Sequence, residues 1–480
     1  MLSKNKEKHM KKATNISRRN FIGKSCAAVG YTTLFSSLIN MKAMAASALD
    51  NSSLANGDYK SLVFLMLGGG NDSFNMLVPR GNPEYNEYAT SRSNLAIPQT
   101  GAGSILPINP ITTDGKSYGL HPSMGNMQQL FETNKLAFLS NVGTLVEPIT
   151  NSTDFYNTAF KKPLGLLSHS DQQQQWHSGR PHERTNIGWG GRIADLVQSM
   201  NANDSISMNI SLRGTNLFQY GQEVIPYVIN NEGSIGILDY EDTDPFNVLK
   251  TNALNSMMDK DYNDVFKNTY INTIKSSNEA SQSFQTAIDA VPDFTTVIPA
   301  NNDLAEQLQM VAKTIAARDT LGFSRQIFYV QIDGWDHHDE LLLNHANLLT
   351  EVNDALEYFN AVTEELTIAE SVTTFSISDF GRTLTSNGNG TDHAWGGNAF
   401  IMGGSVIGKD MYGNYPSLAL NNPLDIQDGR LIPTTSADMY MAELAKWFGV
   451  SNSDLDMIFP NLYRFYDSGS GLPPIGFMNI

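Results

Sequence analysis

Five short apolar runs, each followed by a polar segment that contains glycine, constrain the fold of this chain more than any other feature. Apolar residues stand at consecutive positions in the first run and predominate in the others, as in strands covered on both faces of a parallel sheet. The runs cover residues 62–67, 136–142, 327–332, 374–377 and 399–402. Between them, residues 302–317 and 341–363 show apolar residues at every third or fourth position, which is typical of amphipathic helices. The alternation predicts an α/β fold with a doubly wound, mainly parallel sheet.

One region departs from this alternation. Residues 233–300 are rich in Asn, Asp and Ser, with helical patterns near 246–258 and 261–290. We expect a helical insertion or lid here, within a single domain that spans residues 60–480. Residues 46–59 are small and polar and predict a linker.

Ligands of open α/β sheets bind at the carboxyl ends of the strands, so Asp and His residues that follow the apolar runs are candidate site residues. The first such segment, Gly68-Gly69-Gly70-Asn71-Asp72-Ser73, contains an acid that either takes part in the site or caps a turn. Ser73 is either a nucleophile or an N-cap. The glycine spacing is not G-x-G-x-x-G, which excludes a dinucleotide site.

The second segment contains an acid and an imidazole four residues apart, Asp333 and His337. Both groups are good ligands for zinc and similar divalent metals. His338 is the alternative ligand. The other interpretation is that these are surface histidines at the start of a helix.

The third segment, Ser378-Asp379-Phe380-Gly381-Arg382-Thr383, precedes a glycine-rich stretch around His393. Asp379 and His393 are candidate ligands, and Arg382 is a candidate group for holding an anion. A structural ion pair between Asp379 and Arg382 is the alternative.

The fourth segment begins at His169 and continues through four consecutive glutamines, Gln172 to Gln175. His169 is a candidate site residue at the start of a polar helix, and an ordinary surface helix is the alternative. His121 stands alone in Leu120-His121-Pro122 and is expected to be a packed, hydrogen-bonded histidine.

The N-terminal residues have the order of an export signal. A lysine-rich stretch leads into Ser17-Arg18-Arg19-Asn20-Phe21, which resembles a twin-arginine signal. An apolar run and Ala43-Met44-Ala45, a small-x-small cleavage pattern, follow. The run is interrupted by Ser and Gly, so it does not predict a stable membrane span. We therefore expect a signal peptide over residues 1–45, export by the Tat translocase, and a location in the periplasm or outside the cell.

Removal of this leader would change the composition. The leader holds nine Lys and Arg against one Glu, whereas the whole chain carries −17, so the remainder is near −25. An acidic surface of this kind argues against nucleic acid as a partner. The single cysteine, Cys26, lies in the leader, so the exported protein would have no disulfide.

The motifs together resemble those of the bacterial family known as domain of unknown function 1501, which is similar to the alkaline phosphatase and sulfatase superfamily. They are G-G-N-D-S-F-N, S-H-x-x-x-Q-x-x-W-x-x-G, D-G-W-D-x-H, S-D-F-G-R-T and G-T-D-H-x-W-G-G. The resemblance implies an alkaline phosphatase-like fold. It also implies a metal bound by Asp333, His337 and His393.

The same resemblance shows departures from the superfamily pattern. Asp379 matches a metal ligand of a second site whose histidine is replaced by Phe380. His169 stands where a nucleophilic serine is expected, and Asp72 is displaced from the position of an acid on the first strand. His169 is therefore open to three roles, as a ligand, a general base or a nucleophile.

The resulting expectation is an exported, metal-dependent hydrolase of anionic phosphate or sulfate esters. Zinc is the first choice of metal, with calcium or manganese as alternatives. The catalytic candidates are His169, Asp72 and Arg382, and the metal candidates are Asp333, His337, His393 and Asp379. The alternative is a catalytically inactive binding or assembly protein that keeps one structural metal. A redox enzyme is disfavoured because no organic cofactor fingerprint is present.

Overall fold

A computed structural model describes residues 59–240 and 242–480 of the chain. These residues belong to one compact unit. The predicted signal peptide and nearly all of the predicted linker lie outside the described residues. Among the residues described, no helix is both long enough and apolar enough to cross a membrane.

The centre of the structure is β1 (Lys60–Gly68), which is buried along almost its whole length. It pairs in parallel with β10 (Val372–Ser378) on one side and with β9 (Arg325–Asp333) on the other. Side chains of β1 on both faces are therefore covered, which explains why its sequence is apolar at consecutive positions. The carboxyl ends of these three strands lie at the same edge of the sheet.

The main sheet has ten strands, and its path is β12-β5-β11-β10-β1-β9-β6-β7-β8, with β13 paired to β5. Beyond β10, the strand β11 (Gly397–Gly403) runs antiparallel to both β10 and β5 (Leu136–Gly143). Beyond β9, the strands β6 (Asn209–Ser211) and β7 (Tyr227–Asn230) continue the parallel part. All five apolar runs are strands, and the prediction of a mainly parallel α/β sheet is confirmed.

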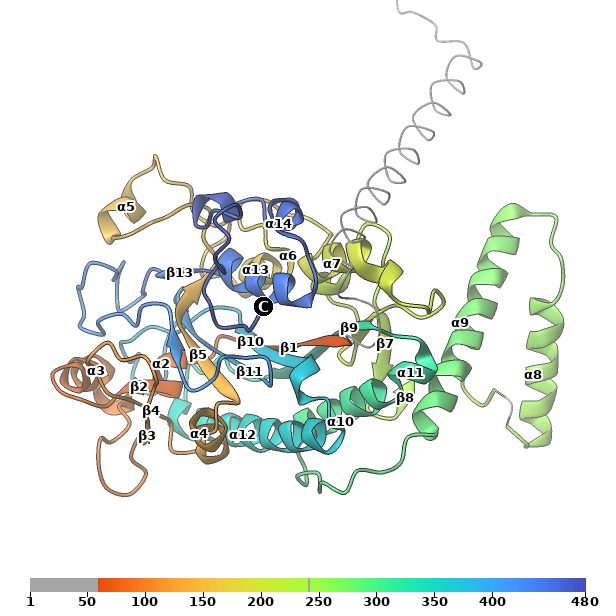
Figure 1. The fold of residues 1–480 in the computed structure, drawn as a ribbon, viewed down its shortest axis with the longest axis horizontal. Coiled ribbons are helices and arrows are strands. Elements are labelled where there is room, and N and C mark those ends of the chain that lie inside the picture. The colour runs from red at the N-terminus through yellow and green to blue at the C-terminus, as the bar shows by residue number, and fades with distance from the viewer. Residues whose placement is uncertain (1–58, 241) are drawn as a thin grey trace, which may run out of the picture. The chain divides into compact units, whose positions relative to one another are not determined.

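Helices cover both faces of the sheet (Figure 1). One layer contains α4 (Gly125–Glu132), α10 (Asp303–Ala316) and α12 (Leu341–Glu365). The other layer contains α6 (His169–Ser178), α7 (Trp189–Val197), α13 (Ala437–Phe448) and α14 (Asn452–Ile458). The two helical patterns expected at 302–317 and 341–363 correspond to α10 and α12.

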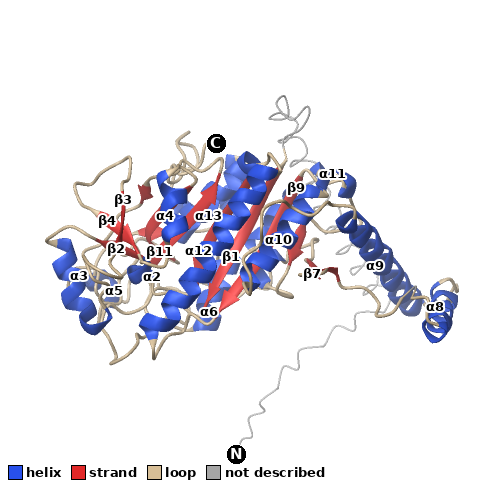
Figure 2. Cartoon of the chain, turned by 90° about the horizontal axis from the view of Figure 1, so that it is seen from below, coloured by secondary structure: helices blue, strands red, loops and turns tan. Residues whose placement is uncertain are grey.

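The other helices and strands complete the described part of the chain. A second sheet has the order β2-β4-β3 and lies beside the main one (Figure 2). The remaining elements are α2 (Ser73–Met76), β2 (Leu77–Pro79), α3 (Glu84–Arg92), β3 (Leu106–Ile108), β4 (Tyr118–Leu120), α5 (Ser152–Tyr156), β8 (Gly233–Ser234), α8 (Pro245–Met258), α9 (Val265–Asp289), α11 (Arg318–Leu321), β12 (Met411–Tyr412) and β13 (Thr435–Ser436).

Within residues 233–300, where helices were expected, α8 and α9 form an antiparallel hairpin that projects from the sheet edge near β7 and β8 (Figure 1).

Candidate metal centre

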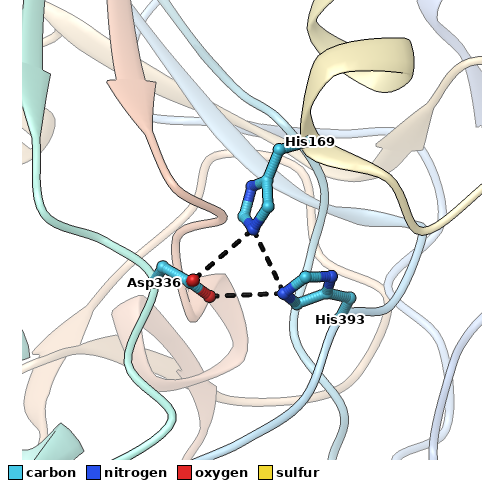
Figure 3. Close-up of side chains that lie close together, drawn as sticks. All are labelled: His169, Asp336 and His393. Carbon is cyan, nitrogen blue, oxygen red and sulfur yellow. Dashed lines mark hydrogen bonds and ion pairs between the residues drawn. The ribbon is translucent and has the colours of Figure 1, made fainter.

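Three side chains from separate parts of the chain converge at the carboxyl edge of the sheet (Figure 3). His169 is the first residue of α6, Asp336 follows β9, and His393 lies in the loop between β10 and β11. One ligand atom from each residue lies within 4.8 Å of the other two, a spacing at which the three could hold one metal ion. We call these three residues the ligand cluster.

The two imidazoles of the ligand cluster are held in defined orientations. His169 Nδ1 lies 2.6 Å from Asp379 Oδ2, and His393 Nδ1 lies 2.8 Å from the carbonyl oxygen of Leu167. Both partners accept hydrogen bonds, so each Nδ1 donates and each neutral ring keeps its lone pair on Nε2. The two Nε2 atoms face each other at 3.1 Å. Two lone pairs at this distance repel each other unless a cation or a proton lies between them.

The spacing of the cluster fits a metal ion. Zinc–nitrogen bonds of about 2.0–2.1 Å in tetrahedral geometry place neighbouring ligand atoms about 3.4 Å apart. Besides the 3.1 Å separation of the nitrogens, Asp336 Oδ2 lies 3.5 Å from His169 Nε2, and Asp336 Oδ1 lies 3.3 Å from His393 Nε2. Metal-bound histidines characteristically donate their other nitrogen to a carboxylate or a carbonyl, as both rings do here.

His338 adds a further imidazole beside the cluster. Its Nε2 lies 3.1 Å from His393 Nε2 and 3.0 Å from Asp336 Oδ1, while its Nδ1 lies 3.2 Å from Asp392 Oδ1. The side chain is 45% exposed, so this imidazole lies on the solvent side. The ring of His338 is therefore oriented like the other two, with Nδ1 facing an acceptor and Nε2 facing the cluster.

The two imidazoles of the cluster differ in how readily they take up a proton. The hydrogen bond that His169 donates to Asp379 raises the pKa of His169, and the charges of Asp379 and Asp336 add to this effect against that of burial. Burial lowers the pKa of His393. A proton would therefore compete with a metal for Nε2 of His169.

Asp336 is kept ionised by its neighbours. Burial raises the pKa of this carboxyl, but the hydrogen bond and charge of Arg382 outweigh that effect and hold the pKa below its usual value. The Nη1 of Arg382 lies 2.6 Å from Asp336 Oδ1. The other donors of Arg382 bind Thr391, and its side chain is fully buried. Arg382 therefore acts on the cluster by positioning Asp336, in place of the predicted direct contact with an anion.

The glycine-rich turn after β1 allows this convergence. Gly69 has a φ of 124°, and a Cβ at this position would lie 2.6 Å from the backbone nitrogen of Asp336. A side chain here would push away the loop that contains Asp336. On the other side, Gly390 lies against the backbone of His337 and His338, which brings the His393 loop beside them. These glycines therefore allow the loops that follow β1, β9 and β10 to pack closely against one another.

Asp379 lies next to the cluster and not in it. Its side chain is fully buried, and Oδ2 binds His169 Nδ1, on the side of the ring away from the cluster. Gln173 Nε2 also donates to Oδ2 at 3.1 Å, and the backbone nitrogen of Gly69 donates to Oδ1 at 3.2 Å. Asp379 was predicted to be a metal ligand, but its position is that of a group that orients the ring of His169.

Two other expected ligands do not join His393. Asp333 is mostly exposed and binds Gln331 and Arg213. His337 is buried, its ring lies against that of His345, and neither ring nitrogen has a hydrogen-bond partner among the residues that the structure describes. Burial lowers the pKa of His337 to about 4. The group of ligand atoms found around His393 therefore contains His169 and Asp336, and Asp333 and His337 are not part of it.

Asp72 is also separate from the cluster. It forms a fully buried ion pair with Arg92, whose guanidinium also binds Asn75 and a backbone carbonyl. The side-chain oxygen of Asp72 that was expected to cap α2 makes no such hydrogen bond. This position indicates a structural role, in place of the catalytic one that was expected.

Sequence reasoning missed Asp336 as a cluster residue. Residues 334–337 after β9 belong to no helix or strand, and tight-turn hydrogen bonds run from His337 N to Trp335 O and from His338 N to Asp336 O. In this loop the side chains of Asp336 and His338 contact each other, whereas the ring of His337 lies against that of His345. The signal was the alternation in Asp336-His337-His338, whereas the four-residue spacing from Asp333 to His337 was misleading.

Together, the fold and the cluster define an α/β protein with a solvent-accessible histidine and carboxylate centre at the carboxyl edge of its sheet. The chain belongs to the family described as protein of unknown function (DUF1501), whose model matches residues 59–458. No curated protein matches it.

Several solved structures resemble the chain at the level of coarse architecture. Ps i-CgsB in complex with k-i-k-neocarrahexaose is 10% identical, with a TM-score of 0.36 over 86% of this chain and 78% of that one. The PsFucS1 sulfatase from Pseudoalteromonas sp. is 11% identical, with a TM-score of 0.34 over 86% and 72%. The lipoteichoic acid synthase LtaP from Listeria monocytogenes is 8% identical, with a TM-score of 0.32 over 83% and 74%.

Proposed function

We propose that this protein is a metal-dependent hydrolase of phosphate or sulfate esters that is exported by the Tat pathway. The observation that carries the proposal is the pair of Nε2 atoms of His169 and His393, which face each other at 3.1 Å while both Nδ1 atoms are bound to acceptors. A divalent metal supplies Lewis-acid polarisation of an ester oxygen and a lowered pKa of water. His169, Asp336 and His393 would hold it, with zinc as the first candidate.

Accessibility favours a reactive centre over a closed structural one. The side chains of His169, Asp336 and His393 are 33%, 44% and 26% exposed, so a substrate can approach the cluster from solvent. Structural zinc sites are closed by four protein ligands, whereas catalytic sites keep a position open. His338, at the exposed side, is placed to contact a bound ester or to complete the coordination.

The nucleophile in this proposal is water. Ser378 Oγ donates to the backbone of Leu67 and accepts from Asn71, and Ser73 Oγ accepts from the backbone of Asn398. Both hydroxyls at the strand ends are therefore engaged in structure. This observation also favours the second candidate, a binding protein that keeps the metal and has no turnover.

The test begins with metal analysis of the purified protein, followed by hydrolysis assays with aryl phosphates and aryl sulfates after loading with zinc, manganese or calcium. We expect about one metal per chain and turnover that His393→Ala abolishes. His182→Ala, which removes an exposed histidine that is not part of the ligand cluster, is the matched control. Metal without turnover supports the binding protein, and absence of metal under all loading conditions rejects both.

The export proposal has its own test. Replacing Arg18 and Arg19 by Lys should retain the protein in the cytoplasm, because the paired arginines are the recognised feature of such signals. Unchanged export of this variant would exclude the Tat route.

A further inference from the structure

We infer that Gln172 and Gln173 are positioning residues of the proposed metal centre, and that together they fix the rings of both of its histidines. The two residues belong to the run of four glutamines in α6, the helix whose first residue is the ligand His169. Each of them binds a group that orients one imidazole. The inference rests on the proposed function, and it adds the residues on which the geometry of the metal ligands depends.

The four glutamines do not all face the same way. With 3.6 residues per turn, Gln174 points about 200° away from Gln172, whereas Gln175 lies within about 60° of it. Burial follows this rotation, because Gln172 and Gln175 are buried, Gln173 is partly buried and Gln174 is exposed. Gln175 accepts a hydrogen bond from Thr144 at 2.7 Å. Three of the four amides therefore face the protein, and Gln174 is a residue of the same type on the solvent side.

Gln173 acts on His169 through Asp379. Its Nε2 donates to Asp379 Oδ2 at 3.1 Å, and the same oxygen accepts from His169 Nδ1 at 2.6 Å. The side chain of Asp379 is fully buried, so donors from the protein set the rotation of its carboxylate. An amide supplies a donor without a positive charge, which leaves the negative charge of Asp379 to act on the imidazole. Gln173 therefore fixes the oxygen that orients His169.

Gln172 acts on His393 through the backbone of Leu167. Its Oε1 accepts from the amide of Leu167 at 2.6 Å, and the carbonyl of Leu167 accepts from His393 Nδ1 at 2.8 Å. Leu167 has a φ of 73°, in the left-handed region that few residues other than glycine adopt. Contacts with the surrounding chain must maintain such a conformation. The hydrogen bond to Gln172 therefore supports the position of the carbonyl that orients His393.

The two paths meet at Asp379. Gln172 Nε2 donates to the backbone oxygen of Asp379 at 3.4 Å, and Trp176 Nε1 donates to the same oxygen at 3.2 Å. One side of α6 therefore holds the loop that follows β10 as well as the loop that precedes α6. The separation of 3.1 Å between Nε2 of His169 and Nε2 of His393 depends on both loops. Ligands held in this way bind a metal more tightly than rings that the metal itself must orient.

Zinc affinity, measured by chelator competition on the purified protein, is the first test. Gln172→Met and Gln173→Met keep the length of the side chain and remove its amide, and Gln174→Met is the matched control on the exposed side of the same helix. We expect a loss of about tenfold in the two test variants and a change of less than about twofold in the control. Gln173→Glu should lose more than Gln173→Met, because it sets a carboxylate against Asp379. Gln174→Glu, which places the same charge in solvent, should bind zinc like the parent.

Nitrogen NMR of the metal-free protein gives a second readout, which a general loss of stability would not reproduce. The imidazole signals of His393 should move most in Gln172→Met, whereas those of His169 should move most in Gln173→Met. Both sets of signals should stay in place in Gln174→Met. Gln173 is only partly buried, so its variants are expected to fold and decide the test if Gln172→Met does not fold.

The outcomes separate this inference from the proposed function. Zinc bound equally well by the parent and both test variants would overturn the inference and leave the proposed function standing. Imidazole signals that move as much in Gln174→Met as in the test variants would also overturn it. A parent that binds no metal would reject the proposed function. The NMR signals would then decide alone, because shifts confined to one ring in each test variant support the positioning of the imidazoles and unchanged signals exclude it.

Discussion

Asp336 and His337 are consecutive in the sequence, yet their side chains lie on opposite sides of the loop that follows β9. Asp336 faces His169 and His393, whereas the ring of His337 packs against His345 in the interior. This relationship separates the residue that belongs to the proposed metal centre from the one that supports the fold beneath it.

Substitution at the two positions should therefore have different effects. Asp336→Asn should weaken zinc binding by more than about tenfold, because it removes the charged oxygen ligand. His337→Ala should leave metal stoichiometry unchanged and lower the free energy of unfolding by about 2 kcal/mol, because it leaves a cavity in a buried region. Chelator competition and urea unfolding measure the two quantities. Loss of metal in His337→Ala would restore the original ligand prediction.

The pair of Asp379 and His169 gives a second prediction. Asp379→Asn should reduce zinc affinity by about 10- to 100-fold, because the carboxylate fixes the ring of His169 with Nε2 toward the cluster. Asp333→Asn is the matched control, since Asp333 is exposed and lies outside the cluster. Equal losses in the two variants would contradict the geometry described above.

The buried pair of Asp72 and Arg92 should contribute to stability and not to chemistry. Asp72→Ala leaves a buried guanidinium without its counter-charge, at a cost of about 3–5 kcal/mol in the free energy of unfolding. The double variant Asp72→Leu with Arg92→Met should recover much of this loss. Urea unfolding checks both values. Loss of turnover in a stably folded Asp72 variant would return this residue to the catalytic group.

A further prediction concerns pH and Asp438, in the first turn of α13. Burial raises its pKa to about 8, and neither carboxyl oxygen has a hydrogen-bond partner in the described chain. The unfolded chain releases this proton near pH 4. The folded state therefore binds more protons between about pH 4 and 8, and this group's contribution makes the protein less stable as pH rises through that window.

Asp438→Asn should remove this dependence. Its melting temperature should be close to that of the parent near pH 4 and exceed it at pH 9, where the ionised Asp438 lowers the free energy of unfolding of the parent by about 5 kcal/mol. Thermal unfolding at several pH values measures the difference, with Asp261→Asn in the exposed loop between α8 and α9 as the control. A difference between variant and parent that does not change with pH would refute the assignment.

The sequence by itself determined the elements and their class. The strands of the main sheet centre are buried on both faces, so their residues had to be apolar at successive positions, and that pattern is local and readable. Likewise, α10 and α12 each pack one side against the sheet, so apolar residues recur at every third or fourth position of their sequences. The motifs indicated the family, and they indicated that His169 and His393 follow or precede strands at one edge of the sheet.

Only the tertiary structure decided which side chains meet. Whether Asp333 or Asp336 faces His393 depends on how three loops pack, and that packing is fixed by contacts between residues far apart in the chain, such as Gly69 with Asp336 and Arg382 with Asp336. The orientation of His169 likewise depends on Asp379, 210 positions away. The spacing of residues along the chain reflects local geometry alone. It could therefore indicate candidate acids and imidazoles, but it could not show which of them lie next to one another in the folded protein.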